Sequence, residues 1–150
     1  MDHFYKDVYG FCDYVGLYRK AVENFSSGSH FVEVGSFLGK SAVFMAVEII
    51  NSGKRIKFDC IDHWKGSEEH CDNENIDTEN LYEKFLENIQ PVKGVINPVR
   101  AESVMASKLY EPNSLDFIFI SLKYSFGSLS KGGKHIKPIT SKDKSLVQNL

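Results

Sequence analysis

The sequence of 150 residues predicts an α/β domain in which helices cover a largely parallel sheet. Short runs of β-branched and aromatic residues alternate with helix-like stretches from residue 30 to residue 120. The first two runs, 30–34 and 56–61, are separated by an apolar segment at 42–50 that suits a crossover helix, so the two strands should be parallel. The length and a hydrophobic content of 42% suit one domain with one core.

The region before the first strand is expected to be helical. Residues 4–25 place apolar or aromatic side chains at intervals of three to four residues, which predicts one or two amphipathic helices. Gly10 and Gly16 interrupt this pattern, and residues 26–29 have the composition of a turn.

The remaining elements alternate in type along the chain. We expect helices at 42–50, 81–89 and 104–110, and strands at 30–34, 56–61, 94–99 and 115–120. Residues 51–53 end the first of these helices. Residues 65–80 are polar and acidic, which predicts a loop or lid between a strand and a helix. Ligands of such sheets bind beyond the carboxyl ends of the strands.

The last thirty residues differ from the rest of the chain. Residues 121–150 lack a sustained period and are rich in Lys, Ser and Thr, which predicts a basic, partly disordered tail after a domain at 1–120. The domain carries 12 basic and 19 acidic side chains, whereas the tail carries six lysines and one aspartate. An acidic body matches a phosphate backbone poorly, so we expect no nucleic-acid partner.

Several other classes of protein are disfavoured. Cys12, Cys60 and Cys71 have no CxxC spacing, which predicts reduced thiols and argues against a disulfide framework or a zinc ribbon. No uninterrupted apolar stretch approaches the roughly 18 to 20 residues that span a bilayer, so we expect no membrane partner. The first residues lack the features of a leader peptide, and a cytoplasmic location is therefore expected.

The most informative motif joins the first strand to the next helix. In FVEVGSFLGKS (residues 31–41), the strand ends near Glu33, turns through Gly35 and Gly39, and opens a helix. Backbone N–H groups at the start of that helix could bind an anionic group. The spacing fits neither GxGxxG nor GxxxxGK[ST]. An ordinary turn with glycines for packing is the simpler alternative.

Two further residues follow the second strand. Asp62 ends that strand, at the position where nucleotide-binding folds offer a carboxylate to ribose hydroxyls; a helix cap or a solvated loop acid is the alternative. Trp64, the only tryptophan, could cover a purine or line the mouth of a pocket, and simple core packing is an equally good interpretation.

Three phrases of the sequence resemble motifs of class I S-adenosylmethionine-dependent methyltransferases. They are FVEVGSFLGKS at 31–41, FDCIDHWKGS at 58–67 and SLDFIFI at 114–120. The most similar branch is that of small-molecule and sugar O-methyltransferases similar to macrocin O-methyltransferase, whose upstream helix matches residues 10–18. The resemblance covers about residues 9–120. It implies a Rossmann-like three-layer α/β/α sandwich with a mainly parallel sheet, whose C-terminal strands are incomplete here.

The resemblance also implies a binding site for S-adenosylmethionine, with S-adenosylhomocysteine as product. The implied residues are Glu33, Gly35, Ser36, Gly39 and Ser41 around the methionine part, Asp62 at the ribose hydroxyls, and Glu102, Ser103 and Trp64 near the adenine edge. Methyl transfer from a sulfonium needs in-line placement of the acceptor oxygen and a base, but no metal.

The sequence departs from the family after the last predicted strand. Ser121 stands where the family usually has an aspartate. The residues after it match the family's later motifs only weakly, so the catalytic residues stay unassigned. No metal site is expected, since His63, His70 and Cys71 match no compact ligand spacing. His135 is more typical of an exposed tail residue than of a displaced base.

The missing strands also affect the strand at 115–120. In the family's order this strand has a neighbour on each side, whereas here one side would be an apolar edge. Such edges favour pairing with another chain unless they are covered. We therefore expect either a homo-oligomer formed through this edge or a tail that folds back over it.

The sequence thus predicts transfer of a methyl group from S-adenosylmethionine to a hydroxyl of a small-molecule or sugar acceptor. The alternative is a non-catalytic cofactor-binding or protein-interaction domain, a truncated relic of a methyltransferase. The acceptor itself is selected by loops and is not indicated by the motifs.

Overall fold

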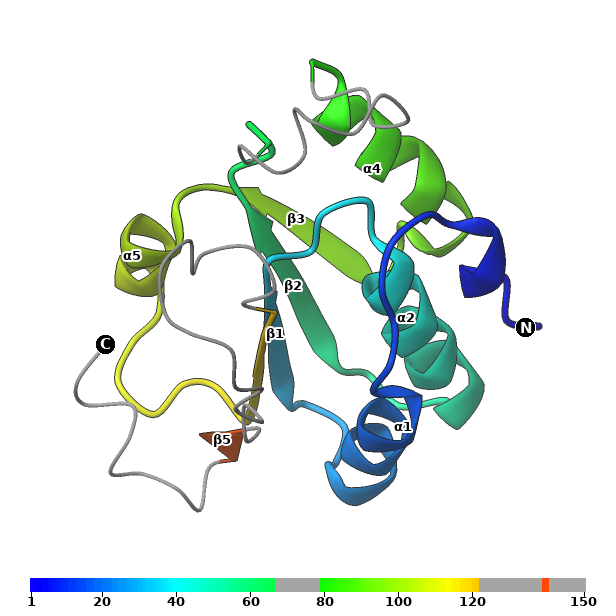
Figure 1. The fold of residues 1–150 in the computed structure, drawn as a ribbon. Helices are drawn as coiled ribbons and strands as arrows, with labels where there is room; N and C mark the ends of the chain where they lie inside the picture. Colours follow the sequence, from blue (N-terminus) through cyan, green and yellow to red (C-terminus); the bar gives the residue numbers. More distant parts are fainter. Residues whose placement is uncertain (67–78, 122–138, 141–150) are drawn as a thin grey trace, which may run out of the picture.

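A computed structural model describes residues 1–66, 79–121 and 139–140, and its architecture confirms the predicted Rossmann-like α/β fold with an incomplete C-terminal part. The middle layer is a sheet in the order β3-β2-β1-β4-β5 (Figure 1). The strands are β1 (His30–Val34), β2 (Lys57–Asp62), β3 (Ile96–Arg100), β4 (Phe117–Ile120) and β5 (Ile139–Thr140). The first four are parallel, and β5 runs antiparallel to β4.

The central strand β1 sets the position of the sheet edge at which α/β sheets of this type bind ligands. Its Val32 is in register with Asp59 of β2 on one side and with Ile118 of β4 on the other. The chain proceeds from β1 to β2 and β3 in one direction, while β4 lies on the opposite side of β1. This reversal is a topological switch point, and open α/β sheets bind ligands beyond the carboxyl ends of the strands at such a point.

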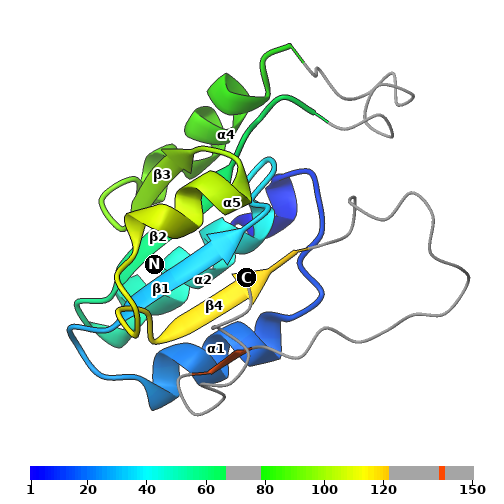
Figure 2. The ribbon, with the colours of Figure 1, turned by 90° about the vertical axis from the view of Figure 1, so that its left-hand side faces the viewer.

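Helices cover the two faces of the sheet unequally. The elements are α1 (Val15–Asn24), α2 (Lys40–Ser52), α4 (Leu81–Ile89) and α5 (Ser103–Ala106), with the 3-10 helices η1 (Tyr5–Asp7), η2 (Gln90–Val92) and η3 (Ser107–Leu109). Figures 1 and 2 show α1 and α2 on one face and α5 on the other. The main core lies on the α2 face and includes Phe31, Phe44 and Phe85. Because α2 is buried against the sheet, its residues 42–47 are all apolar and buried.

The start of the chain differs from the sequence prediction. Of residues 4–25, η1 and α1 are helical, while residues 8–14, which we call the N-terminal segment, have no regular structure. Gly10 in this segment has a φ of +128°, which a right-handed helix does not allow. The segment runs beside the carboxyl ends of β1 and β4 (Figure 2), so it forms a wall at the edge where ligands are expected.

The outer edge of β4 is partly paired within the chain. Ile139 and Thr140 of β5 are in register with Ile118 and Phe117. This pairing is the arrangement that a folded-back C-terminal part would give, and the homo-oligomer stays a prediction. The rest of the predicted tail, at 122–138 and 141–150, and most of the predicted lid, at 67–78, lie outside the described residues.

The sheet face that carries α5 contains a buried polar cluster. Asp59 is only 2% exposed and accepts hydrogen bonds from Asn97 Nδ2 at 2.9 Å and from Tyr110 Oη at 3.0 Å, while His30 Nε2 lies 2.7 Å from it. Burial raises the pKa of Asp59, but the hydrogen bonds from Asn97, His30 and Tyr110 outweigh burial, and the pKa lies below 3.8. The cluster ties three strands to the chain that follows η3.

Gly39 should tolerate a side chain less well than Gly53. Its φ is +88°, and an added Cβ would lie 3.1 Å from the Phe85 ring and 3.2 Å from Ile89 Cγ2. Gly53 at the other end of α2 also has a positive φ of +66°, but its Cβ would meet nothing within 4 Å. We expect Gly53→Ala to cost about 1 kcal/mol for the backbone conformation. Gly39→Ala should cost a further ~1 to 3 kcal/mol for overpacking, measured by urea unfolding. Equal losses in both variants would contradict this packing.

The Asp59 cluster should make stability depend on pH in the acid range. A carboxyl whose pKa is lowered in the folded state stabilises the protein above its unfolded pKa, near 3.8, and this contribution disappears as the pH falls through the folded value. Tyr110→Phe should therefore cost about 1 kcal/mol near neutral pH and progressively less below pH 4. Urea unfolding at several pH values measures this, with the exposed Tyr14→Phe as control. If the loss of unfolding free energy in Tyr110→Phe were the same at every pH, the hydrogen bonds of the cluster would not be what lowers the pKa of Asp59.

Candidate functional site

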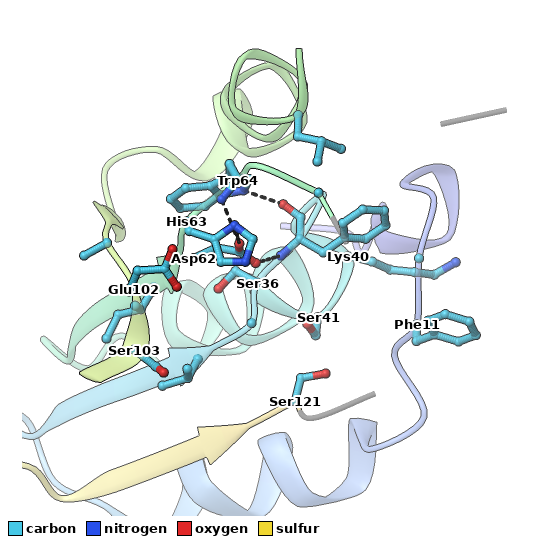
Figure 3. A pocket seen from close by; sticks show the side chains of 18 of the residues that line it. Phe11, Ser36, Lys40, Ser41, Asp62, His63, Trp64, Glu102, Ser103 and Ser121 are labelled. Carbon is cyan, nitrogen blue, oxygen red and sulfur yellow. Dashed lines mark hydrogen bonds and ion pairs between the residues drawn. The ribbon is translucent and has the colours of Figure 1, made fainter. Parts of the chain in front are cut away.

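One cleft opens at the carboxyl ends of β1, β2 and β4 (Figure 3). Its walls are the loop after β1, the loop after β2, the start of α5, the first residue after β4 and the N-terminal segment. The cleft has a volume of about 260 Å³, close to the lower end of the range of small-molecule sites. It lies at the switch point of the sheet.

The turn after β1 requires glycine at its first position. Gly35 has a φ of +85°, and a Cβ there would lie 2.7 Å from the carbonyl oxygen of Ser121. The Gly35 N–H donates to Ile61 O at 2.8 Å, and the Ser121 N–H donates to Val34 O at 2.8 Å. The turn is therefore held tightly between the ends of β2 and β4, where its backbone borders the cleft.

The carboxylate of Asp62 joins the two loops that form the floor of the cleft. Oδ2 accepts the Phe37 N–H at 2.9 Å, and Oδ1 accepts the Trp64 N–H at 2.9 Å. The Trp64 indole Nε1 then donates to Phe37 O at 2.7 Å. We call these three residues the Asp62 clamp. A carboxylate has about four acceptor positions, so Asp62 keeps capacity for hydroxyl groups of a ligand.

Ser36 borders the cleft, but its hydroxyl group is buried. The residue is 3% exposed, and its hydroxyl lies close enough to the Glu33 carboxyl and the Cys60 thiol to oppose the rise in pKa that burial causes in both groups. Ser36 therefore belongs to the polar surroundings of the buried Glu33.

Glu33 lies behind the wall of the cleft. The side chain is 1% exposed, with Oε2 accepting the Tyr18 hydroxyl at 2.6 Å and Oε1 accepting Ser41 Oγ at 3.1 Å. Burial raises the pKa of Glu33, and the surrounding hydroxyl groups oppose part of this effect. Glu33 thus joins β1 to α1 and orients Ser41, which does line the cleft.

Two other predicted residues have mainly packing roles. Gly39 lies under Phe85 and is not part of the cleft wall. Trp64 is 3% exposed, and its ring centroid lies 4.7 Å from that of Phe85 and 4.9 Å from that of Tyr82. Most of the Trp64 side chain is therefore packed in the core, and only a small part of the side chain borders the cleft.

The start of α5 forms the opposite rim. Glu102 and Ser103 line the cleft and are exposed. Glu102 Oε1 lies 3.3 Å from Lys65 Nζ, so an exposed ion pair spans the rim between α5 and the loop after β2. Figure 3 places Glu102 and Ser103 on the side of the cleft away from Phe11 and Lys40.

Sequence reasoning missed the wall formed by the N-terminal segment. Tyr9 and Phe11 line the cleft and are about half exposed, and Lys40 lies beside them. No pattern places these aromatic side chains at the sheet edge, because they precede the first strand by about twenty residues. Ser121 at the end of β4 also lines the cleft, with a hydroxyl where a carboxylate was expected from the family.

Two negative findings apply to the described ranges. No three His, Cys, Asp or Glu side chains gather there as a metal site would require, and His70, Cys71 and His135 lie outside those ranges. No helix within them combines the length and the apolarity that a membrane-spanning segment needs.

The fold defines a Rossmann-like α/β domain with a cleft at its switch point. No family model matches the chain, and no curated protein matches it either. Its function is therefore inferred from the geometry of the cleft.

Glu33 should make stability depend on pH in the opposite direction to Asp59. Because the pKa of Glu33 is raised above 4.5 in the folded state, stability should fall as the pH rises above that value. Glu33→Gln should flatten this part of the curve of unfolding free energy, which urea unfolding at several pH values above 4.5 measures. Burial raises the pKa of Glu48, but hydrogen bonds from Arg19 and His3 bring it below its ordinary value, so Glu48→Gln is a control of opposite sign. An unchanged curve in Glu33→Gln would contradict this assignment.

Proposed function

We propose that this protein binds S-adenosylmethionine in the cleft and transfers its methyl group to a hydroxyl of a small molecule or sugar. One feature supports this function most directly. A carboxylate at the end of β2, Asp62, borders the same cleft as a glycine turn at the end of β1, where Gly35 and Ser36 line the cleft. Nucleotide-binding α/β folds place a ribose-binding acid and a ligand-contacting turn in this relation.

The donor groups around the cleft are compatible with a nucleoside that has an amino-acid tail. Asp62 would accept the ribose hydroxyls with its remaining lone pairs. Glu102 and Ser103 would contact the edge of the base, whose faces would meet the apolar side chains of Ile61 and Leu81. The tail would lie along the turn toward Ser36 and the start of α2.

Catalysis would consist mainly of positioning. When bound, S-adenosylmethionine supplies a methyl group that is electrophilic because it is carried by a sulfonium. The chain's contribution is to hold donor and acceptor in line. The Asp62 clamp fixes the floor of the cleft, and Glu33 fixes Ser41 at its wall. Gly35 allows the ligand to approach the backbone.

A second function is favoured by one residue. Ser121 lines the cleft at the end of β4, and its hydroxyl cannot act as the carboxylate that the resemblance leads one to expect there. A domain that binds the cofactor without turnover is therefore the alternative. Incubation with S-adenosylmethionine and a panel of hydroxylated acceptors distinguishes the two, because only the enzyme releases S-adenosylhomocysteine in an acceptor-dependent manner.

Cofactor binding should depend on Asp62. Isothermal titration with S-adenosylhomocysteine should give a dissociation constant that rises about tenfold or more in Asp62→Ala, since hydrogen bonds to a charged group are lost. Fluorescence of Trp64, the only tryptophan, provides a second signal at the floor of the cleft.

Asp116→Ala is the matched control for this experiment. Its carboxylate also accepts a backbone N–H, that of His30 at 2.8 Å, but at the opposite end of the strands. It should lower stability without changing affinity. Failure of the folded wild-type protein to bind either S-adenosylmethionine or S-adenosylhomocysteine would overturn the proposed function.

A further inference from the structure

A second cavity adjoins the cleft at the N-terminal segment. Its volume is about 420 Å³, which is within the range of small-molecule sites. Its lining includes two charged residues of η1 and four residues that also line the cleft: Lys6 and Asp7, and Tyr9, Gly10, Phe11 and Lys40. The second cavity is therefore placed to hold a molecule next to one bound in the cleft.

Two aromatic side chains border both spaces. Tyr9 is 54% exposed and Phe11 is 51% exposed. The Tyr9 ring lies edge to face with the Phe37 ring, with 6.5 Å between the ring centroids, and a Cβ at Gly10 would be 3.6 Å from the Phe37 ring. These contacts hold the N-terminal segment against the turn after β1. A flat apolar ligand would cover the exposed parts of the two rings, which removes apolar surface from water and adds ring contacts.

The charged side chains of the second cavity are mainly cationic. Lys6 and Lys40 contribute two ammonium groups, and Asp7 contributes one carboxylate. In Figure 3 the Lys40 side chain extends away from Asp62 toward the N-terminal segment, on the side where Phe11 lies. Within the part of the chain that the structure describes, neither lysine forms an ion pair. A ligand with one negative charge would be stabilised here.

A phenol combines the two properties that this cavity favours. Its ring is flat and apolar, and its hydroxyl has a pKa of about 10, as in tyrosine, which nearby ammonium groups lower further. Ser121, which lines the cleft at the end of β4, cannot take a proton as a carboxylate would. An acceptor hydroxyl that ionises readily therefore suits this site better than the hydroxyl of a sugar.

We propose that the second cavity binds the acceptor and that the acceptor is a phenol, with its ring against Tyr9 and Phe11 and its oxygen on the side of Lys40. The inference rests on the proposed function, because it names the acceptor class for that reaction. The phenol loses its proton to water, and the ammonium group of Lys40 stabilises the phenolate. The phenolate oxygen then forms the O–CH₃ bond, while the electron pair of the broken S–CH₃ bond stays on sulfur.

The test compares hydroxylated compounds that differ in the ring and in the acidity of the hydroxyl. Affinities of the full chain for 4-nitrophenol, cyclohexanol and methyl glucoside are measured by isothermal titration with saturating S-adenosylhomocysteine. We expect 4-nitrophenol to bind about tenfold or more tightly than the other two compounds. Because only its ionised form is yellow, absorbance also reports its protonation. Bound 4-nitrophenol should ionise at a lower pH than free 4-nitrophenol.

Matched variants separate the ring contacts from the charge. Phe11→Leu should weaken binding of 4-nitrophenol several-fold, whereas Tyr14→Leu should not, because Tyr14 is 51% exposed on the same segment but lines neither space. Lys40→Met should abolish the shift in the ionisation of bound 4-nitrophenol, and Lys40→Arg should retain it. Lys93→Met, at an exposed lysine that lines neither space, should change nothing.

Two kinds of result would be adverse, and they differ. If the folded wild-type protein binds neither S-adenosylmethionine nor S-adenosylhomocysteine, the proposed function fails and the acceptor site fails with it. If it binds S-adenosylhomocysteine but does not prefer 4-nitrophenol, or if Phe11→Leu and Tyr14→Leu weaken binding equally, the phenol site alone is overturned. Thermal unfolding of each variant confirms that the compared proteins are folded.

Discussion

The cleft depends on the hydrogen bonds that the Asp62 carboxylate makes to two neighbouring loops. It accepts the N–H groups of Phe37 and Trp64, both of which have a φ of +48°, a conformation that costs a non-glycine residue ~1 to 2 kcal/mol. The indole of Trp64 then holds the Phe37 carbonyl. These bonds offset the backbone strain and fix the turn after β1 against the loop after β2. The positions of Ser36, Lys40 and the mouth of the cleft follow from that turn.

Two buried carboxyl groups stabilise opposite faces of the sheet in different ways. Asp59 is satisfied by three donors on the α5 face, and these outweigh the effect of its burial on the pKa. Glu33 is buried on the α2 face with hydroxyl donors only, and there burial has the larger effect. The first cluster ties strands to one another, whereas the second ties β1 to α1 and α2. Neither carboxyl faces the cleft, yet Glu33 orients a residue that does.

Much of the fold could be predicted from local patterns. The strand at 30–34 and the helix around 42–50 have the expected bounds within about two residues, because apolar periodicity and flanking glycines define them. Of the one or two helices expected over 4–25, only η1 and α1 form, and the chain between them is irregular, with Gly10 at a φ of +128° where the segment passes the sheet edge. Periodicity could not reveal this, because the apolar side chains of that segment pack against α2 and the cleft instead of continuing a helix.

The sequence by itself determined the class of fold and the chemistry offered at the switch point. Alternating strands and helices specify a parallel sheet, and the residues at strand ends, such as Gly35 and Asp62, must then meet at one edge. Only the tertiary structure decided which of them border the cleft: Ser36 does, whereas Glu33 points into the core. It also brought the N-terminal segment beside Lys40. Both outcomes depend on packing between segments far apart in the chain, which local pattern does not encode.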